Sequence, residues 1–316
     1  MVLALRAAGE STRLRILALL AAGDLSVGEL ASALGQSQPR VSRHLKLMTE
    51  AGLIERLPEG ASVYYRLTRD DAGARVLADA IAGAIDAGDA SLRRDAARLA
   101  DIRAARDAAA QAYFEANAAD WDRVRRLHLP DADIESAMLE AAGPGPFGLM
   151  VDVGVGAGRI IEAFADRVVR AEGFDLSPKM LAVARAALDA LGGDKAAVRL
   201  GDVYDPPIRP DSADLVTVAH VLRYLADPAR AVANAVRLLK PGGVLLITDF
   251  AAHDLEFLRE RHAHRRLGFA DDDIQAWCAA AGAPATRTIA LAPSHAAATA
   301  LTVKIWRATR IAGVTP

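Results

Sequence analysis

The stretch that decides the fold is residues 149–175, LMVDVGVGAGRIIEAFADRVVRAEGFD. A short apolar run leads into three closely spaced glycines, a helical pattern follows, and a second apolar run closes on Asp175. Glycine has no Cβ, so such a turn lets the backbone bend sharply and come close to a ligand. The helix after the turn directs its free N–H groups at that ligand, and an acid ending the second strand can accept hydrogen bonds from ribose hydroxyls. The stretch therefore predicts a nucleoside-binding corner.

The spacing of the glycines indicates which nucleoside is bound. The dinucleotide fingerprint is G-x-G-x-x-G, whereas this chain has Asp152-x-Gly154-x-Gly156-x-Gly158, with Arg159 where the third glycine would fall. No G-x-x-x-x-G-K-[ST] phosphate loop occurs in the sequence. The pattern resembles motif I and its partner acid in class I S-adenosylmethionine (SAM) methyltransferases. In that family the first acid lies near the methionyl end of the cofactor and the second binds its ribose.

Strand and helix patterns alternate through the rest of the C-terminal half. After the first two strands, further strands are expected near residues 197–200, 213–220, 244–250, 286–291 and 299–307. The alternation favours a parallel sheet with helices on both faces, which binds ligands at the carboxyl ends of its strands. The LKPGG turn at residues 239–243 is a further mark of the family. The expected fold class is α/β, and this C-terminal half is expected to form a seven-stranded, Rossmann-like class I methyltransferase sheet.

The resemblance also implies which residues contact SAM or its demethylated product, S-adenosylhomocysteine (SAH). In the family an acid in the place of Asp202 accepts from the adenine amino group, and the next residue packs on the ring. Tyr113 and Trp121 lie in an aromatic-rich segment that resembles the lid of small-molecule methyltransferases, although interdomain packing is an equal alternative. The expected cofactor-binding residues are Asp152, Gly154, Gly156, Gly158, Asp175, Leu176, Met180, Asp202, Val203, His220, Tyr113 and Trp121.

Residues 1–70 carry a different pattern. Residues 13–20 have apolar residues at helical spacing, Ser26 and Glu29 form a capping box for a second helix, and Ser37 caps a third. Residues 53–67 read as a β-hairpin with a turn at its centre. This succession resembles the winged helix-turn-helix of ArsR/SmtB-type regulators over nearly all of residues 3–68, and it implies a double-stranded DNA operator as partner.

The third helix carries a cationic face opposite its apolar stripe of Val41, Leu45 and Met48. The N-terminal residues of such a helix read base edges in the major groove; plain solvation of the charges is the alternative. Base-edge candidates are Gln38, Arg40 and His44. Other expected DNA-binding residues are Ser37, Ser42, Arg43, Lys46 and Arg56. Residues 24–30 lack the cysteine pair of metal-sensing members, and no histidine falls between His44 and His128, so no metal site is expected.

Residues 71–128 are expected to form one or two long amphipathic helices, broken near Gly88. Their apolar stripe is predicted to form a two-fold interface of a homodimer or to pack on the methyltransferase domain. It comprises Val76, Leu77, Ile81, Ile85, Leu92, Leu99 and Ile102. The expected domains are thus 1–70 for DNA binding, 71–128 for dimerisation, linkage and the lid, and 129–316 for the methyltransferase.

Composition sets broad limits on function. The 316 residues are 52% hydrophobic, enough for two cores, and the formal charge of −2 gives no global sign of nucleic-acid binding. The single cysteine, Cys278, excludes a disulfide framework within the chain and fits a reducing compartment. With no leader pattern and no apolar run of membrane-spanning length, we expect a cytoplasmic protein with no membrane partner.

Which catalytic residues are needed depends on the methyl acceptor. Methyl transfer to oxygen needs a base, for which His220, His253 and Asp249 are candidates; a thiol or amine acceptor can react without one. Three histidines, His253, His262 and His264, lie just past the fifth strand. They could orient an acceptor, bind an anion or metal, or form surface contacts. On one helix, His262 and His264 could not face a single ligand together.

Three functions remain open from the sequence. One is an ArsR-type transcriptional regulator with a SAM/SAH-binding domain that is a small-molecule methyltransferase, a SAM/SAH-responsive repressor, or both. A second is a non-catalytic sensor of SAH or SAM that controls DNA binding. The third is a SAM-dependent methyltransferase that uses the winged helix only for dimerisation; the intact cationic helix face disfavours this one.

Overall fold

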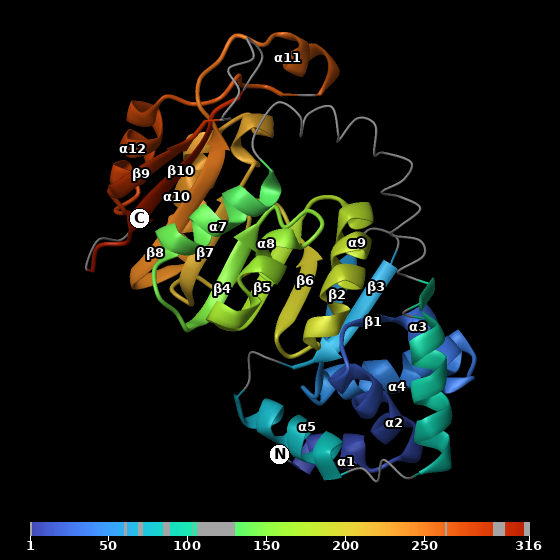
Figure 1. Cartoon of the computed structure of the whole chain (residues 1–316). Coiled ribbons are helices and arrows are strands. Elements are labelled where there is room, and N and C mark those ends of the chain that lie inside the picture. The colour runs from blue at the N-terminus through green and yellow to red at the C-terminus, as the bar shows by residue number, and fades with distance from the viewer. Residues whose placement is uncertain are drawn as a thin grey trace.

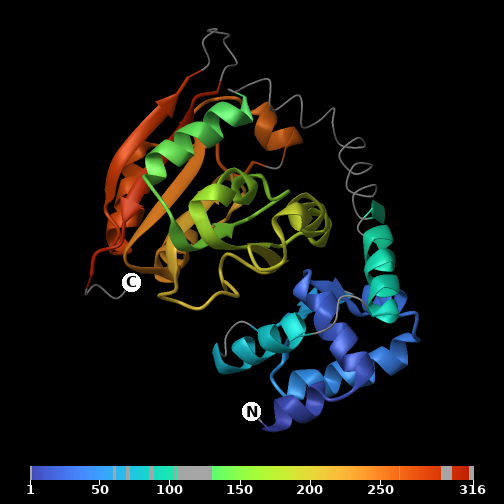
Figure 2. The same ribbon diagram turned by 60° about the horizontal axis from the view of Figure 1, so that its bottom comes forward.

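The structure is a computed structural model that describes residues 2–59, 62–68, 72–84, 89–102, 104–105, 130–262, 264–292 and 301–312. Figure 1 shows a helical N-terminal body below a twisted sheet with helices on both faces. Figure 2 shows the same two bodies from another side. Each has its own buried core, and the sheet divides the core of the larger body in two.

The N-terminal body has the elements of a winged helix. The helices are α1 (Val2–Ala8), α2 (Ser11–Ala21), α3 (Val27–Leu34) and α4 (Gln38–Glu50), and the strands are β1 (Leu25–Ser26), β2 (Ile54–Glu59) and β3 (Ser62–Leu67). The strands pair antiparallel in the order β1-β3-β2, so the expected hairpin is confirmed as the wing. Val41, Leu45 and Met48 of α4 are fully buried, as their spacing predicted.

The helix caps of this body are only partly as expected. The Ser26 hydroxyl accepts from Glu29 N at 3.3 Å, and Glu29 Oε2 accepts from Ser26 N at 2.7 Å, which confirms the capping box. Gly35 ends α3 in the left-handed region, with φ of 63°. Ser37 takes the N-cap position of α4, but its side chain makes no capping bond.

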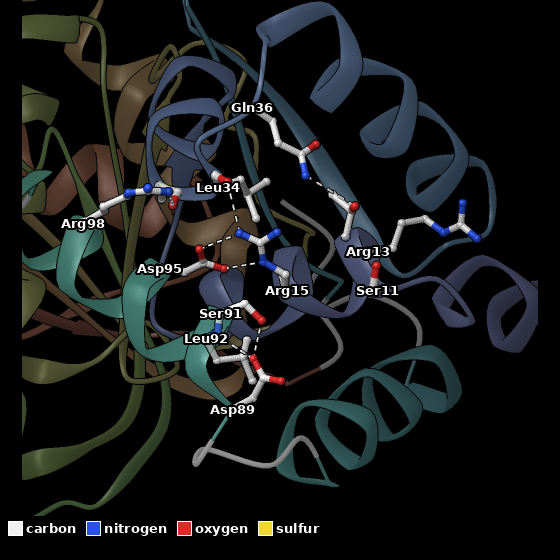
Figure 3. Close-up of polar contacts among 12 residues, drawn as sticks. Ser11, Arg13, Arg15, Leu34, Gln36, Asp89, Ser91, Leu92, Asp95 and Arg98 are labelled. Carbon is white, nitrogen blue, oxygen red and sulfur yellow. Dashed lines mark hydrogen bonds and ion pairs between the residues drawn. The ribbon is translucent and has the colours of Figure 1, made fainter.

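The helices after the wing pack on the wing's own domain. α5 (Ala72–Ala84) and the helical residues 90–102 contribute Ala78 and Leu99 to the winged-helix core, with Leu77, Ile81 and Ile102 packed against it. Asp95 accepts two bonds of 2.6 Å from the Arg15 guanidinium, as Figure 3 shows. Most of the apolar stripe is therefore used inside the winged-helix domain and not against the methyltransferase domain, while Val76 stays exposed, so the two-fold interface remains a prediction. Ile85 and Gly88 lie outside the described residues.

The second body is a seven-stranded sheet of order β6-β5-β4-β7-β8-β10-β9. Its strands are β4 (Phe147–Val153), β5 (Val168–Asp175), β6 (Ala196–Leu200), β7 (Ala213–Ala219), β8 (Leu239–Phe250), β9 (Ala285–Leu291) and β10 (Val303–Thr309). The pairs from β6 to β8 are parallel, whereas β10 is antiparallel to both β8 and β9. The expected parallel sheet is thus a mixed one, because β10 enters between β8 and β9 from the opposite direction.

Helices cover both faces of this sheet. α7 (Asp131–Ala142), α8 (Arg159–Ala163) and α9 (Pro178–Leu188) pack on one face, and α10 (Pro228–Leu238) and α12 (Asp271–Ala280) on the other. α11 (Phe257–Arg261) lies beyond the carboxyl end of β8. Within the described ranges, no helix is both long and apolar enough to cross a bilayer.

Candidate functional site

The first candidate surface is the outward face of α4. Its polar and cationic side chains are exposed: Ser37, Gln38, Arg40, Ser42, Arg43 and Lys46, together with Arg56 on β2. His44 differs from this pattern. Its side chain is only 16% exposed and its Nδ1 lies 3.6 Å from Glu10 Oε2, at the N-cap of α2. His44 therefore packs toward α2, which weakens its candidacy for reading base edges.

The second candidate site begins at the glycine turn after β4. Gly154, Gly156 and Gly158 have φ values of 71°, 51° and 89°, a region that side chains other than glycine rarely adopt. A Cβ on Gly154 would come within 2.4 Å of Val221. The amides of Gly154 and Val155 both donate to Phe174 O, at 2.9 and 3.0 Å. The turn is thereby held against the end of β5, with its backbone open to a ligand.

Asp175, the last residue of β5, ties this turn to α9. Its Oδ2 accepts from Gly156 N at 3.0 Å, and its Oδ1 accepts from Ser177 N at 2.8 Å. The Ser177 hydroxyl in turn accepts from Met180 N at 3.3 Å and caps α9. The carboxylate thus stands between the carboxyl ends of two neighbouring strands, where the second acid of the motif was expected.

A cavity opens above the glycine turn. Its volume is about 660 Å³, counting the part open to solvent. The sequence predicted four of its lining residues, Asp152, Gly154, Gly156 and His220. It missed the residues of α7 because that helix reaches the site only through tertiary packing. Two of them, Glu135 and Asp131, hold Arg159 at the site. The further lining residues are Asp131, Ile134, Glu135, Val155, Ala157, Arg159, Ile160 and Ala219.

Family profiles match both bodies. Residues 10–56 match the bacterial regulatory proteins of the arsR family, and residues 151–247 match a methyltransferase domain. The chain joins an ArsR-family helix-turn-helix to a methyltransferase domain.

Individual relatives resemble the methyltransferase part. A demethylmenaquinone methyltransferase of Renibacterium salmoninarum is 32% identical over 117 residues, which are 36% of this chain and 46% of the relative. A ubiquinone biosynthesis O-methyltransferase of Thiobacillus denitrificans is 40% identical over 95 residues, or 30% and 40% of the two chains. This chain thus spans less than half of either curated relative. A solved candidate methyltransferase of Bacillus halodurans shares the fold, with a TM-score of 0.50, 19% identity, and coverage of 56% of this chain and 98% of that one.

Within the methyltransferase domain, Asp152 lies at the base of the cavity. It is 1% exposed and accepts from the Thr217 hydroxyl at 2.6 Å. Burial raises the pKa of its carboxyl to about 7; the Thr217 bond acts in the opposite direction, and the charge of Asp175 adds to the increase. Near neutral pH this acid is therefore divided between its protonated and ionised forms.

The other predicted cofactor residues that the structure describes are not part of the cavity lining. Gly158 packs against α9, and the Met180 methyl carbon is 3.8 Å from where a Cβ on Gly156 would stand. Leu176 is 63% exposed after β5, and Asp202 and Val203 follow β6, with Asp202 Oδ1 accepting from Tyr204 N at 2.9 Å. Tyr113 and Trp121 lie outside the described residues.

The structure gives Asp249 a different setting from that of a general base. Asp249 is fully buried, and its Oδ1 lies 3.0 Å from Nη1 of Arg223, itself 7% exposed. It also accepts from the backbone amides of Arg223 and Phe250. Burial alone would lower the pKa of Arg223, but the Asp249 charge and further contacts keep it raised. Asp249 is therefore committed to a buried ion pair.

His220 connects this ion pair to the cavity. It lines the cavity, has a φ of 60°, and its amide donates to Thr248 O at 2.7 Å. Its Nδ1 is 2.8 Å from Arg223 Nη1. A guanidinium can only donate, so Nδ1 accepts and the neutral imidazole carries its proton on Nε2. In this arrangement His220 is a hydrogen-bond donor at its other ring nitrogen.

The remaining histidines gather around Phe250. Its ring centre is 6.1 Å from that of His253 and 6.2 Å from that of His264. Burial, then the positive charge of Arg223, lowers the pKa of His264 to about 3. α11 ends at Arg261, so His262 and His264 both lie beyond the helix. The argument that two histidines on one helix cannot face the same ligand therefore does not apply to them. The charge of His262 also contributes to the lowered pKa of His264. Among the described residues, no three His, Cys, Asp or Glu side chains are arranged to hold a metal ion.

Proposed function

We propose that the protein is an ArsR-type transcriptional regulator whose binding to a DNA operator responds to SAM or SAH held by its methyltransferase domain. The observation that carries this is the presence, in one chain, of an exposed cationic face on α4 and a glycine–acid cavity. The α4 face supplies donors for base edges and phosphates. The cavity supplies the open glycine backbone and the Asp152 carboxylate, and Asp175 adjoins it through its bond from Gly156 N.

The residues present fit such a cofactor. In this proposal Asp175 accepts hydrogen bonds from the ribose hydroxyls, and Asp202 accepts one from the adenine amino group. Asp152 lies toward the methionyl end of the cofactor. The three left-handed glycines let the ligand approach the backbone. SAM supplies a methyl group on a positively charged sulfur; SAH has lost both, so the charge near Asp152 differs between the two ligands.

The test is an operator-binding titration by fluorescence anisotropy, with the full chain alone, with SAM and with SAH, at two stated salt concentrations. Allosteric coupling of ordinary size would change the operator Kd by about 5- to 150-fold. An operator Kd unchanged by both ligands, each shown by calorimetry to bind, would reject the proposal.

We further propose a homodimer that forms through α1 and α5. Apolar side chains are exposed on both helices: Val2, Leu3 and Leu5 on α1 are 64%, 71% and 50% exposed, and Val76 on α5 is 69% exposed. These helices lie at the end of the molecule away from the seven-stranded sheet (Figures 1 and 2). A two-fold dimer there would place half-sites about 34–36 Å apart on DNA.

The second candidate function is methyl transfer to a small molecule. It is favoured by His220, which lines the cavity and lies beside Phe250, whose other neighbour is the neutral His264. His253 Nδ1 accepts from Leu255 N at 3.2 Å, so neutral His253, like His220, carries its proton on Nε2. Both imidazoles are then donors, which favours an acceptor that attacks without a base, such as a thiolate or an amine.

This candidate is tested by incubating the protein with methyl-labelled SAM and panels of thiols, amines and phenols, followed by mass spectrometry. Methylated thiols or amines with unreacted phenols are expected. Methylated phenols whose formation falls in His253→Phe would show that His253 acts as a base after all. No transfer to any acceptor would leave the sensor as the function.

A further inference from the structure

The wing of the DNA-binding domain lies against the methyltransferase domain, beside α9 and β6 (Figure 1). Arg185 of α9 is buried, and its guanidinium carbon is 3.8 Å from the centre of the Tyr64 ring on β3. Its Nη2 also donates to Val198 O at 3.3 Å. A desolvated guanidinium over an aromatic face is a favourable contact, so Arg185 fastens the wing to α9.

A second point of contact lies at the start of the helix-turn-helix. A Cβ built on Gly193 would come within 2.5 Å of the Cα of Gly23, so the two backbones touch. Between the contacts lies a cavity of about 340 Å³, counting the part open to solvent, whose lining includes Asp24, Arg185 and Asp189. The interface is therefore joined at two defined points, Arg185 against Tyr64 and Gly193 against Gly23.

The other side of α9 touches the proposed cofactor site. α9 begins three residues after Asp175, whose Oδ1 accepts from Ser177 N. A Cβ on Gly158 would lie 3.2 Å from the Leu188 side chain and 3.5 Å from the Cα of Ala184. The glycine turn thus packs on Ala184 and Leu188, while the intervening Arg185 faces the wing.

We propose that α9 transmits occupancy of the SAM/SAH site to the wing through the contact between Arg185 and Tyr64. This rests on the proposed function and adds its route. Ribose hydroxyls on Asp175 would compete with the amides of Gly156 and Ser177, which shifts the first turn of α9 against the glycine turn. α9 moves as one rigid helix, so Arg185 carries the shift to Tyr64. Tyr64 pairs with Leu57, beside the phosphate candidate Arg56.

The experiment measures one ratio in the full chain: the operator Kd with saturating SAH divided by the Kd without it. Arg185→Met removes the cation at similar length, Tyr64→Ala removes the ring, and Gly193→Val forces the backbones apart. We expect each to bring the ratio to within about twofold of 1, from a wild-type effect of about 5- to 150-fold. Tyr64→Phe keeps an aromatic face under Arg185 and should keep the wild-type ratio.

A second readout is the SAH Kd, measured with and without operator DNA. Coupling of binding is reciprocal, so operator should change the SAH Kd of the wild type and of Tyr64→Phe by the same factor, and leave it unchanged in Arg185→Met. SAH affinity without DNA should stay at the wild-type value in Arg185→Met, which shows that its domain is folded.

Three outcomes overturn the inference. A wild-type ratio in a folded Arg185→Met does so directly. If that variant fails to bind SAH, a wild-type ratio in both Tyr64→Ala and Gly193→Val does so instead. The third outcome is an operator Kd of the wild-type chain that neither SAM nor SAH changes. It overturns the proposed function together with the route through α9, whereas the first two outcomes overturn the route alone.

Discussion

Asp152 shows how one buried side chain can give this site a response to pH. Burial in the fold raises the pKa of its carboxyl from an ordinary 3.8 to about 7. For an acid with a raised folded pKa, the contribution to folding stability is fully present below the unfolded pKa. It is lost as pH rises through about 7. Above that pH the folded protein holds a negative charge beside the cavity.

That charge predicts a preference for SAM that increases with pH. The ratio of SAH Kd to SAM Kd should rise between pH 6 and pH 8, because ionised Asp152 attracts the sulfonium that only SAM carries. The amino group common to both ligands cancels in the ratio. Calorimetry at the two pH values measures it, and Asp152→Asn, with no titrating group, should give a ratio that does not change with pH.

Replacing Asp175 is expected to weaken the binding of SAM and SAH. Asp175→Ala removes the carboxylate proposed to accept two ribose hydroxyls, and hydrogen bonds to charged groups contribute roughly 1.5–3 kcal/mol each. Affinity for SAM and SAH should therefore fall by about 100-fold or more. Calorimetry on Asp175→Ala measures the loss, and Asp166→Ala, on the same domain but away from the cavity lining, serves as control. Unchanged affinity in Asp175→Ala would remove the ribose site from the proposal.

At the scale of elements, α4 separates into residues that face outward and one that does not. Arg40 and Arg43 are exposed, whereas His44 lies against Glu10. Arg40→Ala should weaken operator binding by about 1–3 kcal/mol and relax specificity at one base pair; Arg43→Ala should lower the salt slope by about 1. His44→Ala should leave both quantities near wild type. Anisotropy titrations over salt and operator variants test this, and a larger loss for His44→Ala than for Arg40→Ala would contradict it.

An ion pair with α2 ties the helix at residues 90–102 to the winged-helix domain, in addition to its apolar packing. Asp95 is 1% exposed and Arg15 is its partner. Removing one partner of a buried pair is costly, and the partly exposed Arg15 reduces the loss to roughly 2–3 kcal/mol. Asp95→Asn should lower the denaturant midpoint of the winged-helix transition accordingly. Glu50→Gln, which alters only the exposed pair with Lys46 at 3.9 Å, should change stability by less than about 0.5 kcal/mol.

At the scale of the whole molecule, the exposed apolar residues predict the oligomeric state. The double variant Leu3→Asp, Val76→Asp places charges where we propose that two protomers meet, and should halve the mass measured by light scattering. The variant should also weaken operator binding, since two half-sites are no longer held together. Leu176→Asp, a substitution of an apolar residue that is 63% exposed in the other domain, should remain a dimer. A wild-type chain that is already monomeric at the concentrations used for DNA binding would contradict the prediction.

The sequence by itself determined the features that depend on neighbouring residues. The glycine turn, the acid after β5, the capping box at Ser26 and the buried stripe of α4 all follow from spacing within a few residues, where backbone conformation and side-chain periodicity act directly. For the same reason both domain types were identifiable from short motifs, and matching family profiles confirm them.

Only the tertiary structure decided features in which distant residues meet. It placed α7 over the cavity, paired Asp249 with Arg223, and ran β10 antiparallel between two neighbours. It turned the apolar stripe of residues 77–102 onto its own domain and set Arg185 on Tyr64. An apolar stripe indicates that it will be covered, and a lone charge indicates that it will be paired, but neither indicates the partner. The hydrophobic effect is non-directional, so the packing of the whole chain decides which partner it is.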